Sequence, residues 1–152
     1  METDRVRIDK VDMPESLKTQ QGTLKVILDS NALFVPLRFK IDIFEDVKAL
    51  LNRNFTPILI PAVRREIEKM AEMASPKVRR EAAYALKLTE KCRLIKADEE
   101  EGSADDVIVK VAYELGAAVF TNDTQLRKRL RNINMPVIYV RQKSHLKIDG
   151  RL

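Results

Sequence analysis

Residues 104–123, "ADDVIVKVAYELGAAVFTND", contain the change of pattern that decides the fold. Apolar residues at helical spacing run from Ile108 to Leu115 and stop at Gly116, a residue type that commonly ends helices. The run "AAVFT" (117–121) follows and is apolar throughout, as expected of a strand that is covered on both faces. A helix that leads directly into such a strand is typical of the βαβ unit of a parallel sheet.

The same alternation extends along most of the chain. Four further segments favour strands: "TLKVILDS" (23–30), "TPILIP" (56–61), "CRLIKA" (92–97) and "PVIYVR" (136–141). Four others have helical spacing: "IDIFEDVKALLNR" (41–53), "AVRREIEKMAEMA" (62–74), "KVRREAAYALKLTEK" (77–91) and "TQLRKRLRNI" (124–133). The sequence therefore predicts a three-layer α/β/α fold around a central parallel sheet of about five strands. Residues 23–141 would form this domain, between an N-terminal arm (1–22) and a basic C-terminal tail (142–152), because neither end has a strong periodicity.

Composition limits the class of protein. The 152-residue chain is long enough for one domain, and its single cysteine, Cys92, excludes a disulfide framework and a cysteine-rich zinc site. No segment approaches 18 consecutive apolar residues, and residues 1–22 have no apolar signal core, so we expect a cytoplasmic protein without a membrane span. The net charge of +5 suits a polyanionic partner such as nucleic acid, although thermophilic surfaces are also rich in Lys, Arg and Glu.

Two acidic residues directly follow predicted strands. Asp29 closes "VIL" and Asp123 follows "AVFT", so both are expected at the carboxyl edge of the sheet, where α/β proteins place their sites. Two more acids lie on apolar helix stripes. Glu66 falls between Val63 and Met70, and Asp105 extends the stripe of the following helix toward its start. Its neighbour Asp106 turns aside and is expected to pair with Lys110.

Each acid taken alone has a structural explanation. Asp29, Asp123 and Asp105 can cap helices or turns, and Glu66 can pair with an arginine. Four acids at one sheet edge are harder to explain, because close carboxylates repel by about 4 kcal/mol per pair at an effective dielectric near 20. A cation removes that cost, and an all-oxygen ligand set selects Mg²⁺ or Mn²⁺. Such a site suits phosphoryl transfer or phosphodiester hydrolysis.

Four motifs carry a family resemblance. In order, "VILDSNAL", "IPAVRREIEKM", "GSADDVIVKVA" and "AVFTNDTQL" resemble the acidic motifs of PIN-domain ribonucleases. The resemblance covers about residues 23–141 and implies Mg²⁺- or Mn²⁺-dependent cleavage of RNA. It assigns metal binding and catalysis to Asp29, Glu66, Asp105 and Asp123, and supporting positions around them to Asn31, Asp106, Thr121 and Asn122. Many relatives have a further acid where this chain has Gln125, which puts a second metal ion in doubt.

Two subgroups are similar to this chain. VapC-type toxins cleave tRNA or rRNA and are held inactive by an antitoxin, whereas pre-rRNA processing nucleases act on the ribosomal precursor particle. Homodimers are common among such proteins, so a second copy is a further candidate partner. The segment "RKRLR" supplies candidate RNA-binding cations, Arg127, Lys128, Arg129 and Arg131, which can equally form a merely solvated helix face. A catalytically weak RNA-binding module of ribosome assembly is the alternative from outside the enzyme class.

Overall fold

A computed structural model describes residues 23–96 and 103–152, so the expected N-terminal arm lies outside the described part of the chain. The sheet has six strands in the order β3-β2-β1-β4-β5-β6. The strands are β1 (Leu24–Leu28), β2 (Phe55–Leu59), β3 (Arg93–Leu94), β4 (Ala118–Phe120), β5 (Val137–Arg141) and β6 (His145–Asp149). The first five are parallel and β6 is antiparallel to β5. The predicted α/β fold with a mostly parallel central sheet is confirmed.

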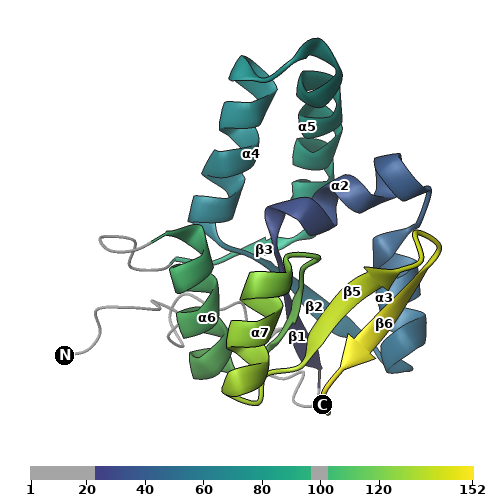
Figure 1. Cartoon of the computed structure of the whole chain (residues 1–152), viewed down its shortest axis with the longest axis vertical. Helices are drawn as coiled ribbons and strands as arrows, with labels where there is room; N and C mark the ends of the chain where they lie inside the picture. The colour runs from purple at the N-terminus through teal and green to yellow at the C-terminus, as the bar shows by residue number, and fades with distance from the viewer. Residues whose placement is uncertain (1–22, 97–102) are drawn as a thin grey trace.

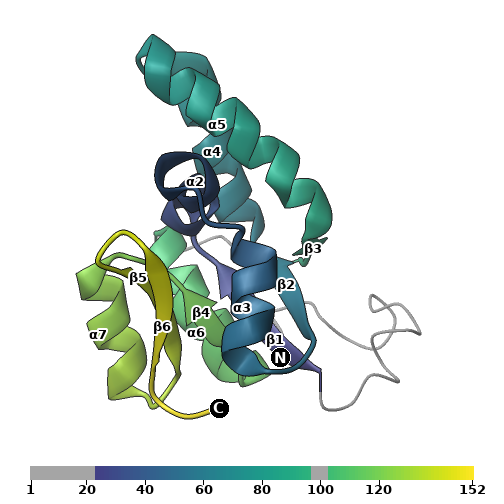
Figure 2. The ribbon, with the colours of Figure 1, turned by 90° about the vertical axis from the view of Figure 1, so that its right-hand side faces the viewer.

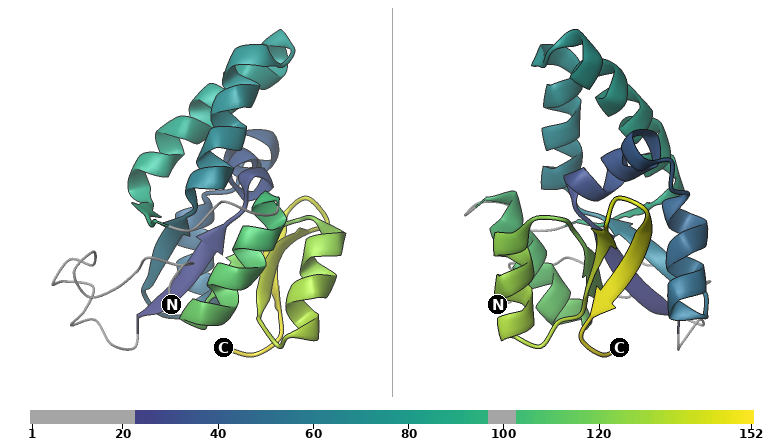
Figure 3. Two further views of the ribbon diagram at one scale, coloured as in Figure 1. Left: turned by 90° about the vertical axis from the view of Figure 1, so that its left-hand side faces the viewer. Right: turned by 45° about the vertical axis from the view of Figure 1, so that its right-hand side comes forward.

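Helices cover both faces of the sheet (Figures 1 and 3). They are α2 (Ser30–Phe39), α3 (Ile43–Leu51), α4 (Pro61–Met73), α5 (Pro76–Leu88), α6 (Ala104–Leu115) and α7 (Thr124–Asn132). Helix α3 lies on one face, and α6 and α7 lie side by side on the other. Helices α4 and α5 pack against each other and rise beyond the sheet edge from which α2 and α4 start (Figures 1 and 2).

The two central strands carry the most deeply buried residues. In β1, Val26, Ile27 and Leu28 are at most 1% exposed, and β4 is buried along its whole length. Because both strands are covered on both faces, their sequences have no polar side for water, which explains the continuous apolar runs. No helix in the described ranges is long and apolar enough to cross a membrane.

The sequence predicts no element between residues 30 and 41, where the structure has α2. Pro36 lies inside this helix, and a proline there removes a backbone donor and normally breaks a helix. The helix persists because Asp29 caps its first turn and because four consecutive residues, 32–35, are buried in the core. Burial of these side chains outweighs the local propensity.

The structure corrects the prediction of a C-terminal tail. Residues 145–149 form β6, whose five residues pair with β5 from Val137 to Arg141. The turn before β6 has positive φ at Gln142 and Lys143, two residue types that rarely mark such turns, so the sequence carries no hairpin signal there. The sheet therefore has a sixth strand, and the domain extends beyond residue 141.

An ion pair joins α2 to α5 behind the sheet edge. Arg38 donates from Nε (3.2 Å) and Nη2 (2.9 Å) to Oε1 of Glu81, a buried residue, and its guanidinium lies 4.6 Å from the centre of the Phe34 ring. The hydrogen bond from Arg38 holds the pKa of Glu81 below its ordinary value. The pair therefore stabilises the position of the α4–α5 hairpin on α2.

We expect Glu81→Gln to lower the free energy of unfolding by about 1 kcal/mol at neutral pH, measured by urea denaturation. Glu68→Gln is the matched control, because Glu68 meets Arg64 at 3.4 Å with both side chains nearly half exposed, and it should cost less than about 0.5 kcal/mol. Since the folded-state pKa of Glu81 is lowered, its contribution is present at neutral pH and is lost as the pH falls through that pKa. Equal losses in the two variants would contradict the assigned role.

Candidate active site

Asp29 lies where β1 and β4 end side by side. Its backbone N–H donates to the carbonyl of Phe120 (3.0 Å), and its side chain is buried. Oδ1 accepts from the backbone N–H of Ser30 (2.8 Å), and Oδ2 accepts from Thr121 Oγ1 (2.7 Å) and Asn31 Nδ2 (3.0 Å). Burial raises the pKa of Asp29, while the bonds from Thr121 and Ser30 act in the opposite direction. The carboxylate is thus held in one orientation in a place that disfavours its charge.

Three polar side chains connect the ends of β1, β4 and β5. Thr121 Oγ1 accepts from the backbone N–H of Asp123 (3.1 Å) and lies 3.3 Å from Asn31 Nδ2. The backbone N–H of Asn122 donates to Asn31 Oδ1 (2.9 Å), and Asn122 Oδ1 accepts from the backbone N–H of Val140 (2.8 Å). The positions that the motifs assign to support the acids therefore form one hydrogen-bonded network along the sheet edge.

Asp123 and Asp105 bring two further carboxylates to Asp29. Asp123 caps α7, and its Oδ1 accepts from the backbone N–H groups of Gln125 (2.9 Å) and Leu126 (3.2 Å). Asp105, at the second position of α6, is half-buried and has no hydrogen bond or ion pair to the residues that the structure describes. Burial raises the pKa of Asp105, and the charges of Asp29 and Asp123 add to this effect. The charge of Arg129 acts in the opposite direction but does not reverse the shift, so Asp105 is a carboxylate without a hydrogen-bond or ion-pair partner among the described residues.

Asp106 differs from its neighbour in every respect. It forms a capping box with Ser103 at the start of α6, accepting from the Ser103 backbone N–H at 3.0 Å. Its Oδ1 lies 2.8 Å from Nη2 of Arg129, so its ion-pair partner is Arg129 on α7 rather than the expected Lys110. The bond from the Ser103 backbone, followed by that from Arg129, holds the pKa of Asp106 below its ordinary value. Asp106 joins α6 to α7.

The structure partly corrects the prediction made for Glu66. The sequence places it on the apolar stripe of α4, but Val63 and Ile67 are buried while Glu66 is exposed, because it lies on the flank of that stripe. Its charge still contributes to the raised pKa of Asp29, so α4 brings Glu66 toward the same sheet edge.

The donor set fits a hard divalent cation in its chemistry. The four acids offer only oxygen, and Asp105 and Oδ2 of Asp123 are without protein donors in the described ranges. No three described His, Cys, Asp or Glu side chains are close enough to hold an ion as they stand, so binding would have to draw the carboxylates together. Burial raises the pKa of Cys92 to about 12, so its thiol stays protonated at neutral pH and cannot serve as a nucleophile.

The cations of α7 fall into separate groups. Arg129 faces Asp106, whereas Arg127 and Arg131 both contact Asp149 of β6, at 3.4 Å each. Lys128 is exposed and has no ion pair within the described ranges. Asp149 was not recognised from the sequence, although the alternation in "HLKID" (145–149) is a strand signal that could have predicted β6.

The chain is similar to known proteins over most of its length. The family model described as "PIN like domain" matches residues 26–143. Ribonuclease VapC4 of Methanocaldococcus jannaschii is 28% identical over 127 residues, which cover 83% of this chain and 97% of that protein. Ribonuclease VapC9 of Archaeoglobus fulgidus is 28% identical over 150 residues and 98% of each chain. The rRNA-processing protein fcf1 of Schizosaccharomyces pombe is 30% identical over 117 residues, 76% of this chain but 58% of that protein.

Solved structures show the same fold. The PIN domain endonuclease Utp24 superposes with a TM-score of 0.71 at 26% identity, over 84% of this chain and 92% of that one. A chain of VapBC2 from Rickettsia felis gives a TM-score of 0.57 at 17% identity, over 78% of this chain and 100% of that one.

We predict that Thr121→Val lowers the free energy of unfolding by about 1–3 kcal/mol, because it leaves the buried Asp29 without its shortest donor and the Asp123 N–H without an acceptor. Thr121→Ser retains the hydroxyl and is the control in thermal denaturation. A valine variant as stable as the serine variant would show that this hydroxyl does not hold the carboxylate.

Neighbouring aspartates should respond in opposite directions when each is changed to asparagine. Asp105→Asn removes a repelled charge and should raise the free energy of unfolding in chelator by about 0.5–2 kcal/mol. Asp106→Asn weakens the capping box and the Arg129 ion pair and should lower the melting temperature. Calorimetry of both variants without divalent cations measures this, and a shift of the same sign in both would contradict it.

Proposed function

Because the chain belongs to the PIN-like domain family, we propose that it is a Mg²⁺- or Mn²⁺-dependent endoribonuclease acting at the carboxyl edge of its sheet. The observation that supports this most is the half-buried, unpartnered carboxylate of Asp105 beside the buried Asp29. A structural role gives no reason to retain that repulsion, whereas a bound cation turns it into attraction.

In this proposal, Asp29, Asp105 and Asp123 would hold the cation, and Glu66 on α4 would contribute a further carboxylate. Asp29 is kept in place by its three donors, so it would act as the fixed ligand. A bound cation of this type lowers the pKa of a water and offsets the charge that develops on the attacked phosphate. Asp105 and Glu66, which make no protein hydrogen bonds within the described residues, can adjust to the ion.

The surrounding polar residues would orient these ligands. Thr121 and Asn31 fix Asp29, while Asn122 ties the end of β4 to β5. Asp106 would act indirectly, by fixing the start of α6 from which Asp105 projects. Loss of such supporting groups typically costs 10- to 100-fold in metal affinity or activity.

Two biological roles remain candidates. The VapC ribonucleases are matched over 97% and 98% of their length, which favours a VapC-type toxin with a protein antitoxin. The rRNA-processing protein fcf1, which is 30% identical over 76% of this chain, favours processing of a ribosomal RNA precursor. Incubation with tRNA, mature rRNA and precursor rRNA separates them, since cleavage confined to precursor segments supports processing and cleavage of tRNA or mature rRNA supports the toxin.

We predict that Asp105→Asn reduces Mn²⁺- or Mg²⁺-stimulated RNA cleavage at least about 100-fold, because it removes a ligand rather than a support. Glu68→Gln, at an exposed acid on α4, is the control and should cleave like wild type. Chelator should abolish cleavage by wild type. Wild-type activity in Asp105→Asn would refute its role as a ligand, and absence of metal-dependent cleavage by wild type would refute the enzyme proposal and leave an RNA-binding module.

A further inference from the structure

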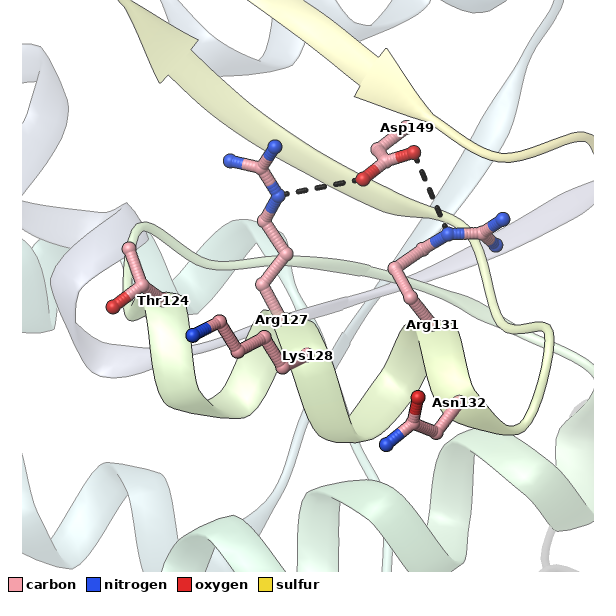
Figure 4. Close-up of a pocket in the computed structure, with 6 residues that line it drawn as sticks. All are labelled: Thr124, Arg127, Lys128, Arg131, Asn132 and Asp149. Carbon is pink, nitrogen blue, oxygen red and sulfur yellow. Dashed lines mark ion pairs between the residues drawn. The ribbon is translucent and has the colours of Figure 1, made fainter.

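A basic pocket lies on the outer side of α7, next to the proposed active site but not part of it. It has a volume of about 400 Å³ and is lined by Thr124, Arg127, Lys128, Arg131, Asn132 and Asp149 (Figure 4). Asp149 comes from β6 and the other residues come from one side of α7. We propose that this pocket binds a backbone phosphate of the RNA strand whose neighbouring segment lies at the acidic edge, an inference that rests on the proposed ribonuclease function.

Two arginines in the pocket are held in position. Arg127 Nε lies 3.4 Å from Oδ2 of Asp149, and Arg131 Nε lies 3.4 Å from Oδ1, so one carboxylate orients both guanidinium groups (Figure 4). The Arg127 guanidinium also lies 3.9 Å from the centre of the Tyr139 ring, and Arg131 Nη1 donates to the carbonyl of Met135 (3.3 Å). Since two cations share one anion, the pair keeps a net positive charge. Their ordered nitrogen atoms suit phosphate oxygens.

Lys128 supplies the cation that is not engaged by protein. It is exposed, has no ion pair within the described ranges, and points toward the same side of α7 as Thr124 (Figure 4). The pocket therefore combines three cationic side chains with one carboxylate, and Thr124 and Asn132 add polar groups at its ends. An anion is the ligand that this lining favours.

A second pocket continues the basic surface past the end of α7. It has a volume of about 540 Å³, and its lining includes Arg131, Asn134, Gly150 and Arg151, so the two pockets share Arg131. Gly150 has φ +101°, and a Cβ there would meet Nη1 of Arg131. The positive φ favours glycine at this position, because side chains rarely adopt that backbone conformation. Together the pockets form an extended basic surface, which suits a polymer with repeated phosphates better than a single small anion.

The pocket lies where an RNA strand that passes over the acidic sheet edge would place a neighbouring phosphate. Thr124 directly follows Asp123, and at 1.5 Å per residue Lys128 lies about 6 Å further along α7 than Thr124. Arg129 is excluded from this pocket, because it points to Asp106 on α6. Of the four cations expected to bind RNA, three therefore line the proposed phosphate pocket. The fourth, Arg129, instead forms an ion pair with Asp106 at the start of α6.

The test measures RNA binding without cleavage. The full chain carrying Asp105→Asn is titrated, in chelator, with a short fluorescent single-stranded RNA. Adding Lys128→Gln should weaken binding about three- to tenfold at low salt and make the slope of log K against log salt shallower by about 0.7. Lys128 contacts no described partner, so the variant should melt like its parent. Lys87→Gln, at an exposed lysine of α5, is the matched control and should bind like the parent. Equal affinities for the Lys128 and Lys87 variants would overturn the proposal.

A second arm identifies the group that is bound. The same titrations are repeated with an RNA analogue whose linkages are uncharged methylphosphonates. The difference between the Lys128 and Lys87 variants should disappear, because no phosphate charge remains to be neutralised. A difference that persists would mean that Lys128 contacts sugar or base, which would overturn the phosphate assignment.

Failure of the pocket can be told apart from failure of the proposed function. Metal-dependent cleavage by wild type, combined with unchanged RNA affinity in Lys128→Gln, refutes the pocket alone. Weakened binding in Lys128→Gln, combined with no cleavage by wild type in Mg²⁺ or Mn²⁺, supports the pocket and refutes the nuclease.

Discussion

The buried carboxylate of Asp29 is the constraint on which the sheet edge depends. A carboxylate in this position is costly unless donors surround it, and here the three donors come from two places: the first turn of α2, through the Ser30 N–H and Asn31, and Thr121 after β4. Satisfying one charge therefore fixes the start of a helix and the ends of two strands at once. Thr121 also accepts a hydrogen bond from the backbone N–H of Asp123, so the same hydroxyl positions the residue that caps α7.

The pair Asp105–Asp106 shows how one helix start separates two roles. Both residues precede the same buried face, yet burial and nearby acids raise the pKa of Asp105, while the Ser103 backbone and Arg129 lower that of Asp106. Asp106, which has the ion pair with Arg129, anchors α6 to α7, whereas the charge of Arg129 only partly offsets the raised pKa of Asp105. Such divergence between neighbouring acids is typical of functional sites, where an unfavourable charge is retained for the ligand that it binds.

The sequence predicted those features that depend on burial and missed those that depend on local exceptions. Apolar runs identified the central strands, because Val26–Leu28 and Ala118–Phe120 are covered on both faces and leave no polar positions there. Helix α2 was not predicted, because it contains Pro36 and its stability comes from tertiary packing. The turn before β6 uses Gln142 and Lys143 at positive φ, so no glycine or asparagine indicated it. At the candidate site, strand ends located Asp29 and Asp123, but a helix period resolves only the face of α4 and so misjudged the exposure of Glu66.

Ion pairs, rather than the net charge, determine which cations of α7 are available to bind a ligand. The total of +5 and the run "RKRLR" suggest a uniform basic patch, but ion pairs divide it. Arg129 compensates an acid beside the candidate metal site, Arg127 and Arg131 share Asp149, and Lys128 has no protein counter-ion within the described ranges. Because Asp123 caps the helix that carries all four cations, any shift of α7 would move acids and cations together. Helix α7 therefore links the proposed phosphate pocket to the proposed metal site at the sheet edge.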